Sequence, residues 1–395
     1  MIYSIFSKYV TLLTQFFVIY FTFQLYDVEG RGVVAGLMSV FTLVGIGLSL
    51  TIGRGFLYML SREESSEFDL IKSVLLLGVI FSLITVLIHS FFIGFYPGFY
   101  GIIEEKYVLL FLLSSFYYLW VQVSQYVYSG IGKLGKYNTQ TLVLALSQVL
   151  LCICAYFFAW GLESFITFLS ITMFFFTAIN WIYLHLHSGN KAVLGNYKAK
   201  IVKSGLTLHI DTIGGYLMGA VSIFVVNLYL TLEDVAVYDL YIKVFSLFAA
   251  FPQVVQLFFN RFVFRKDING NVLTRQLRIF KVVTVLYSVM IIFVVLSAFF
   301  VPQVDPYVAG TILIAFVPYY WCSIIAPLWI RFGDSLRLSF VTVSIGIVGV
   351  IIMVLGVKEH GIYGASFGFL FTYTTTSIVN LIYYRIKVKK ELLSG

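Results

Sequence analysis

The chain has 395 residues, of which 60% are hydrophobic and only 11% are charged, with a net charge of +8. A soluble globular protein has about a quarter of its residues charged, so this composition excludes a protein whose surface lies mostly in water. The positive charge does not predict a nucleic-acid partner, because the basic residues stand in short segments between apolar runs, as membrane topology requires.

Apolar runs long enough to cross a bilayer, roughly 20 residues each, recur along the whole chain. The first six predicted spans cover residues 5–25, 33–59, 73–93, 107–129, 139–159 and 163–186. The other six cover residues 205–230, 236–258, 280–300, 308–330, 338–357 and 361–384. The first run has no small-residue cleavage site and continues into "YDVEGRG", so we expect a retained first span rather than a signal peptide.

The distribution of charge orients these spans. With a cytoplasmic N-terminus, the inner segments hold 21 basic residues, whereas the outer segments hold only Arg31, Lys106 and Lys358 beside nine acidic residues. This asymmetry follows the positive-inside rule and predicts twelve spans with both the N- and C-termini in the cytoplasm. The predicted outer loops are short, which argues against a membrane glycan polymerase or ligase, since such enzymes need a sizeable extracytoplasmic domain.

The widest basic break before the midpoint, residues 185–205, separates six spans from six. We therefore predict an N-terminal six-helix bundle (1–190), a cytoplasmic linker (191–204) and a C-terminal six-helix bundle (205–395). A shift of 204 residues aligns "MSVFTLVG" (38–45) with "IKVFSLFA" (242–249), a weak internal similarity. Two six-span halves in the same orientation form a parallel repeat, the layout in which transporters hold substrate between their halves.

Ionisable residues inside predicted spans mark candidate functional positions, because charge in a membrane is costly. They are Arg54, His89, His209, Asp211, Asp239 and Lys243. Arg54 either snorkels to the inner headgroups or faces a cavity, and its neighbours Gly53 and Gly55 favour close approach of another backbone or a ligand. Asp239 and Lys243 are four residues apart, so they either neutralise each other or leave a lysine to meet an anion. We expect His89 at the outer interface.

Motifs of catalysis are missing from the sequence. There is no G-x-x-x-x-G-K-[ST] phosphate loop, no H-E-x-x-H, no G-x-S-x-G and no carboxylate pair in one loop. Cys152, Cys154 and Cys322 lie in apolar runs with no metal or redox spacing, so we expect small buried side chains. These absences predict a carrier rather than an enzyme, with no cofactor and no metal site.

Several stretches resemble one transporter family across nearly the whole chain. They are "SKYVTLLTQFFVIYFTFQLY" leading into "DVEGRG", "VFTLVGIGLSLTIGRGF", and "LEDVAVYDLYIKVFSLFAAFPQVVQ". Together with the predicted topology, the chain resembles the polysaccharide flippases, which translocate O-antigen and capsule repeat units and belong to the multidrug/oligosaccharidyl-lipid/polysaccharide (MOP) exporter superfamily. The resemblance implies a MATE/MOP-like fold. The chain departs from the family in having few arginines in helix 1 and the outer half of helix 2.

The resemblance implies a cargo and a set of roles. The cargo would be an undecaprenyl-diphosphate-linked oligosaccharide, flipped from the inner to the outer leaflet of the bacterial cytoplasmic (inner) membrane by alternating access, for O-antigen, capsule, exopolysaccharide or lipopolysaccharide biosynthesis. The roles are diphosphate binding by Arg54 and Lys243, glycan contact by Gln122, Gln125 and Asn180, and coupling to H⁺ or Na⁺ by Asp211 and Asp239. From the residues alone, the glutamines are equally interpretable as interhelical packing.

Other readings of the sequence stay open. A cation-coupled drug antiporter of the same superfamily would need a cavity in which carboxylates outnumber cations, whereas Arg54 and Lys243 here balance Asp211 and Asp239. A polymerase or ligase, or a scaffold subunit of a polysaccharide-assembly complex, is a further alternative. Expected partners are the lipid-linked cargo, membrane lipids and other polysaccharide-assembly proteins, with the chain itself a monomer.

Overall fold

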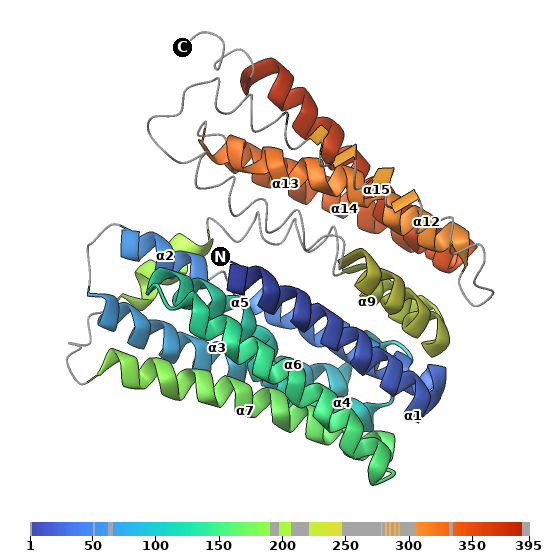
Figure 1. Ribbon diagram of the computed structural model, residues 1–395, viewed down its shortest axis with the longest axis horizontal. Coiled ribbons are helices and arrows are strands. Elements are labelled where there is room, and N and C mark those ends of the chain that lie inside the picture. Colours follow the sequence, from blue (N-terminus) through green and yellow to red (C-terminus); the bar gives the residue numbers. More distant parts are fainter. Residues whose placement is uncertain are drawn as a thin grey trace. The chain divides into compact units, whose positions relative to one another are not determined.

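The computed structural model describes residues 2–49, 52–61, 66–189, 197–206, 221–246, 305–331 and 335–388, with scattered positions between 278 and 292. The described residues are helical or lie in turns, and no strand occurs among them. The chain forms two compact units (Figure 1). The first comprises Met1–Ile213 and Asn227–Val237, and the second comprises Gly214–Val226 and Tyr238–Gly395.

The first unit is an all-helical bundle. Its elements are α1 (Ile2–Ser49), α2 (Ile52–Ser61), α3 (Glu67–Phe95), the short 3₁₀ helices η1 (Pro97–Tyr100) and η2 (Leu112–Ser114), α4 (Glu105–Phe111), α5 (Ser115–Gly130), α6 (Leu134–Phe157) and α7 (Leu162–Ser188). A further helical stretch covers residues 198–206. Helix α5 packs against α1, α2, α3, α6 and α7, so side chains on α5 are positioned by most of the bundle.

Helix α3 shows the side-chain distribution of a membrane-spanning helix. Its buried positions include the small or polar residues Ser73, Gly78, Ser82, Thr85 and His89. The exposed large side chains of the same helix are apolar: Phe68, Leu76, Ile80, Leu83, Leu87, Phe91 and Phe95. Small and polar residues between helices and apolar residues outside are what a bundle solvated by lipid requires.

Helix α1 contains a sharp break that separates the first two predicted spans. Asp27 has φ 56° and ψ −172° between two helical segments, so the break between these segments is confined to a single residue. A non-glycine residue that combines positive φ with extended ψ is rare, because this region is adopted almost only by glycine. Spans were predicted at 5–25 and 33–59 with a loop between them, but the helix resumes directly after Asp27.

The second unit contains α12 (Pro306–Ile314), α13 (Phe316–Arg331), α14 (Ser335–His360), α15 (Ile362–Tyr383) and a short π-helical end, η3 (Tyr384–Val388). A helical stretch at 232–246 crosses from the first unit into the second after Val237, and α9 (Val221–Tyr229) crosses in the opposite sense after Val226. Helix α15 packs along α14, α13 and α12. Gly356 and Gly364 allow the close contact of α14 with α15, because a Cβ on Gly364 would lie 2.0 Å from the backbone of Gly356.

In the part of the chain that the structure describes, six helices are long and apolar enough to cross a membrane. The prediction of an all-helical, multi-pass membrane protein is therefore confirmed. Twelve spans and cytoplasmic termini stay predictions, since residues 207–220, 247–277 and 293–304 lie outside the described residues. The division into residues 1–190, 191–204 and 205–395 also stays a prediction.

Candidate functional site

Arg54 lies in the first turn of α2 and is held by a neighbouring helix. Its side chain is half-buried, and its Nε donates a hydrogen bond of 3.2 Å to the hydroxyl of Tyr126 on α5. The guanidinium carbon lies 5.7 Å from the centroid of the Tyr126 ring, within range of a cation–π attraction. The hydrogen bond fixes the direction of the guanidinium, so Arg54 is oriented by the bundle.

The two glycines beside Arg54 bring other backbones close to α2. A Cβ on Gly53 would lie 2.9 Å from the carbonyl oxygen of Val123 and from the Tyr126 ring. A Cβ on Gly55 would lie 2.3 Å from the carbonyl oxygen of Ile201, in the helical stretch 198–206. The triplet therefore seats α2 between α5 and that stretch, with the arginine between the two contacts.

The predicted glycan-contacting residues lie in different environments. Gln122 is half-buried one turn before Tyr126, so it shares the face of α5 that meets Arg54, whereas Gln125 is exposed. Asn180 on α7 is fully buried, and its Nδ2 donates 2.8 Å back to the carbonyl oxygen of Phe176. The structure thus brings Gln122 close to the contact between Arg54 and Tyr126. The side chain of Asn180 donates its hydrogen bond within α7. Their roles toward a glycan stay predictions.

Two of the remaining predicted site residues, Asp239 and Lys243, lie on the helical stretch 232–246. Asp239 is buried, with 3% of its surface exposed, and Lys243 one turn later is half-buried. Both belong to the second unit. Asp211 and His209 lie outside the described residues. Coupling by Asp211 or Asp239 and anion binding by Lys243 therefore stay predictions.

Arg31 is a buried arginine, which corrects its assignment to an outer loop. Only 2% of its surface is exposed, because the helix resumes at once after Asp27 and carries Arg31 into the bundle. Arg31 lies close to Cys152 of α6. It stands between Gly30 and Gly32 just as Arg54 stands between Gly53 and Gly55, so the repeated Gly-Arg-Gly triplet was the signal that could have identified it.

His89 is fully buried within the first unit, near the end of α3, and its depth in the membrane stays a prediction. Its ring stacks on Phe41 of α1 with centroids 3.9 Å apart and planes 13° apart. Its Nδ1 lies 2.9 Å from the hydroxyl of Tyr100, and that hydroxyl donates 3.0 Å to the His89 carbonyl oxygen. Because the Tyr100 hydroxyl donates its proton to the carbonyl oxygen, the hydrogen bond between His89 and Tyr100 is donated by the Nδ1–H of His89. The aromatic neighbours explain the burial of a histidine near a helix end.

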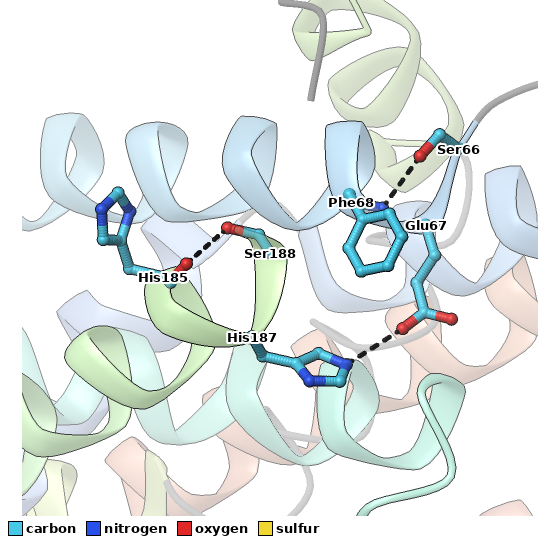
Figure 2. Close-up of polar contacts among 6 residues, drawn as sticks. All are labelled: Ser66, Glu67, Phe68, His185, His187 and Ser188. Carbon is cyan, nitrogen blue, oxygen red and sulfur yellow. Dashed lines mark hydrogen bonds and ion pairs between the residues drawn. The ribbon is translucent and has the colours of Figure 1, made fainter. Parts of the chain in front are cut away.

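One end of the first unit carries a side-chain hydrogen bond between α3 and α7 (Figure 2). The Nε2 of His187, in the last turn of α7, lies 3.3 Å from Oε1 of Glu67, in the first turn of α3. Ser66 caps α3 by accepting from the Phe68 N–H at 3.2 Å. An acid at a helix N-terminus and a histidine at a C-terminus both complement the helix dipoles, so this contact is readily explained as a structural tie.

The acidic turn around Asp27 lines a pocket of about 520 Å³. Its walls are formed by residues 26–30, Leu162 and Glu233, so Asp27 and Glu29 share it with Glu233, which lies in the first turn of the stretch 232–246. Across the described residues, no group of three or more His, Cys, Asp or Glu side chains is arranged to hold a metal ion.

Comparisons with known proteins bear on the fold. No protein-family profile and no curated protein sequence matches the chain. Among solved structures, an inward-facing multidrug-resistance MATE transporter of the MOP superfamily aligns with TM-score 0.71 and 14% identity, covering 98% of this chain and 96% of the other. The lipid II flippase MurJ in an inward closed conformation aligns with TM-score 0.72 and 13% identity, covering 99% and 88%.

A third structure is a MOP-superfamily transporter from Pyrococcus furiosus, described as having a binding pocket of reversed polarity. It aligns with TM-score 0.58 and 13% identity, covering 98% of this chain and 94% of the other. At such identities the similarity establishes the fold: this chain is a multi-pass membrane protein with the MATE/MOP transporter fold, as the resemblance implied. Neighbours of this fold include drug exporters and a lipid-linked flippase, so the fold does not determine the cargo.

Proposed function

We propose that this protein flips an undecaprenyl-diphosphate-linked oligosaccharide from the inner to the outer leaflet of the bacterial cytoplasmic membrane, for surface polysaccharide biosynthesis. The observation that carries the proposal is Arg54: an arginine inside a membrane-crossing stretch, half-buried and oriented by Tyr126. An arginine held in this way offers a diphosphate the paired donors that match its oxygens.

The charge of the first unit supports an anionic cargo. The same membrane-crossing stretch contains a second arginine, Arg31, which is buried. Ionisable residues inside a membrane bundle are rare and mark candidate functional positions, so two positively charged residues on one stretch favour a negatively charged headgroup over a cationic one. The fold is shared with the lipid II flippase MurJ at TM-score 0.72, which shows that this architecture accommodates a lipid-linked cargo.

The proposed transport cycle assigns the remaining roles. Arg54 and Lys243 bind the diphosphate, and Gln122, Gln125 and Asn180 contact the sugars. Asp211 and Asp239 bind the coupling H⁺ or Na⁺. The two units then alternate their access to the two sides of the membrane, while the polyprenyl tail stays in the bilayer. The protein acts as a transporter without an enzymatic step.

The second candidate is a cation-coupled drug antiporter, and the buried Asp239 favours it. A carboxylate with 3% exposure in a helical bundle suits a cationic drug or a coupling ion as well as it suits a lysine one turn away. The fold is also that of multidrug-resistance MATE transporters. The charge of the cargo therefore separates the two candidates.

Binding to the purified protein in lipid nanodiscs tests the choice directly. Native mass spectrometry would compare undecaprenyl diphosphate, undecaprenyl monophosphate and the lipophilic cation tetraphenylphosphonium. We expect tight binding of the diphosphate, weaker binding of the monophosphate and none of the cation. Binding of tetraphenylphosphonium with no binding of the diphosphate would replace the flippase proposal with the antiporter.

A further inference from the structure

A buried asparagine connects α9 to the first unit. Asn227 is fully buried, and its Nδ2 donates a 2.9 Å hydrogen bond to the carbonyl oxygen of Tyr100, 127 residues away in the chain. Its Oδ1 lies 2.8 Å from the position that a Cβ on Gly36 of α1 would occupy. The Asn227 side chain therefore fits between α1 and the turn after η1, where only a glycine on α1 leaves room.

The backbone of Asn227 fits equally closely. Gly101 follows Tyr100 with φ +65°, and a Cβ there would lie 2.1 Å from the carbonyl oxygen of Asn227. Both the conformation and the space at this position require glycine. Five residues further along, the Leu232 carbonyl oxygen lies 2.0 Å from the Cβ position of Gly32 on α1. Three glycines of the first unit thus pack closely against Asn227 and Leu232.

The acceptor of the Asn227 bond is itself fixed. Tyr100 is 2% exposed, and its hydroxyl is tied to His89 of α3 through both the ring Nδ1 and the backbone carbonyl oxygen. His89 in turn stacks on Phe41 of α1. The Tyr100 carbonyl group is therefore held in place by contacts within the first unit. The hydrogen bond from Asn227 is made to this immobilised acceptor.

The segment that these contacts hold is the part of α9 and its continuation that clusters with the first unit. Asn227–Val237 belongs to that unit, whereas Gly214–Val226 before it and Tyr238 onward after it belong to the second. We call residues 227–237 the anchor segment. The chain thus enters the first unit in the middle of α9 and leaves it in the middle of the helical stretch 232–246.

We propose that Asn227 fixes the anchor segment to the first unit, so that the segment moves with this unit whenever the two units change their relative position. The chain then bends where it enters and leaves the anchor segment, next to Val226 and Val237. This inference goes beyond the proposed cargo, because it requires only that the units move and holds for any transported molecule.

The anchoring has its physical basis in the free-energy cost of removing the Asn227 side-chain amide from its buried site. Withdrawing Asn227 leaves both its N–H₂ and the Tyr100 carbonyl without a partner in a dry site, and an unpaired buried polar group costs about 1–3 kcal/mol. The glycine contacts at Gly32, Gly36 and Gly101 add close packing over a short segment. Replacing Asn227 by leucine keeps the volume and removes the donor, so it isolates the hydrogen bond.

Distances between spin labels in nanodiscs test the proposal. The background protein has Cys152, Cys154 and Cys322 changed to alanine. One labelled protein carries Glu105→Cys in the first unit and Glu233→Cys in the anchor segment, both at exposed positions. A second labelled protein carries Glu105→Cys and the exposed Glu359→Cys of the second unit. We expect a single narrow Glu105–Glu233 distance distribution, narrower than the Glu105–Glu359 distribution. A Glu105–Glu233 distribution as wide as the other would overturn the proposal.

Asn227→Leu then tests the residue itself. We expect it to widen the Glu105–Glu233 distribution at least twofold. The matched control is Asn180→Leu, a second fully buried asparagine whose Nδ2 donates within its own helix, and it should leave that distance unchanged. An unchanged width in Asn227→Leu, or equal widening in both variants, contradicts an anchoring role. Because no cargo is added, this result is independent of whether the protein binds undecaprenyl diphosphate.

Discussion

Arg54 and Tyr126 form a hydrogen bond of 3.2 Å between α2 and α5, with the guanidinium 5.7 Å from the tyrosine ring. A snorkelling arginine would need no such partner, since its purpose is to reach the headgroups. The bond instead keeps the guanidinium against α5, on the face that also carries Gln122. This relationship favours a role for Arg54 inside the protein.

Arg54→Ala should weaken binding of undecaprenyl diphosphate by about tenfold or more, because a hydrogen bond to a charged group contributes roughly 1.5–3 kcal/mol. Arg54→Lys should recover only part of the affinity, since a lysine keeps the charge but loses the planar pair of donors. Tyr126→Phe should give a smaller loss, because it removes the orienting bond and keeps the cation. Isothermal binding in nanodiscs measures all three.

Lys358→Ala is the matched control for Arg54, because it removes a cation from the last turn of α14 in the other unit. Its affinity for the diphosphate should equal that of the unaltered protein. If Arg54→Ala also binds normally, the arginine is a headgroup anchor and the diphosphate is bound elsewhere.

Gly55→Ala should destabilise the first unit, since the added methyl would lie 2.3 Å from the Ile201 carbonyl oxygen. Overpacking of this kind costs about 1–3 kcal/mol. Gly47→Ala provides the comparison, because Gly47 is helical and nothing lies within 4 Å of its Cβ position. That change should be neutral or stabilise by about 0.5–1 kcal/mol. The unfolding temperature in detergent should therefore fall for Gly55→Ala and stay the same or rise for Gly47→Ala. Equal shifts in the two variants would refute the packing argument.

Much of the helical arrangement follows from the sequence, because a bilayer imposes a minimum length on each apolar run. The predicted spans at 73–93 and 163–186 lie inside α3 and α7, which extend a few residues beyond them, and the predicted span at 139–159 overlaps α6, which begins and ends earlier, at Leu134 and Phe157. Helix α3 begins before its predicted span, because the residues near its N-cap, Ser66, are polar and a polar sequence predicts a loop. A turn between residues 25 and 33 was predicted, but its length was overestimated, because Glu29 and Arg31 are charged and yet belong to a helix.

Asp305 should make the second unit less stable in acid. Burial raises the pKa of its carboxyl, but hydrogen bonds from Tyr363 and from the backbone N–H groups of Val308 and Tyr307 outweigh this effect and lower the pKa below its usual value of 3.8. A folded-state pKa below the unfolded one stabilises the protein above the unfolded pKa, and this stabilisation is lost as pH falls through the folded pKa. We expect the unfolding temperature to fall below about pH 4.

Asp305→Ala tests this assignment. It removes the cap of α12 and the contact with Tyr363 of α15, and loss of an N-cap costs about 0.5–2 kcal/mol. The variant should unfold at a lower temperature at neutral pH and lose less on acidification than the unaltered protein. Asp234→Ala, in the exposed turn with Thr231, serves as a comparison that leaves α12 intact. An acid response of Asp305→Ala equal to that of the unaltered protein would assign the effect to other carboxylates.

Arg31→Met should fold and yet lose transport, because methionine fills much of the buried volume without the charge. Lys106→Met removes an exposed lysine of the first unit, paired with Glu104 and Glu163, and should keep both folding and transport. Size-exclusion chromatography reports folding and a flipping assay reports transport. Normal transport by Arg31→Met would show that the buried charge has only a structural role.

The candidate site was less predictable than the fold, because burial depends on which helices meet. Sequence alone identified Arg54 but not Tyr126, which is 72 residues away and is brought close by the α2–α5 contact. Asn227 lies in the predicted span 205–230, but its bond to Tyr100 depends on the space left by Gly36 and Gly101, which the sequence does not reveal. The burial of His89 was not predicted, because its stacking partner Phe41 lies on another helix.

The central claim is tested most directly by reconstituting the purified protein in liposomes with a fluorescent undecaprenyl-diphosphate-linked oligosaccharide and measuring how much label a membrane-impermeant quencher reaches. In protein-free liposomes about half of the label is expected to be accessible, since a symmetric bilayer places half of it in each leaflet and the headgroup cannot cross hydrocarbon unaided. We predict that the protein makes nearly all of it accessible and that Arg54→Ala reduces the rate. Quenching no greater than in protein-free liposomes, with folded protein present, would contradict the account.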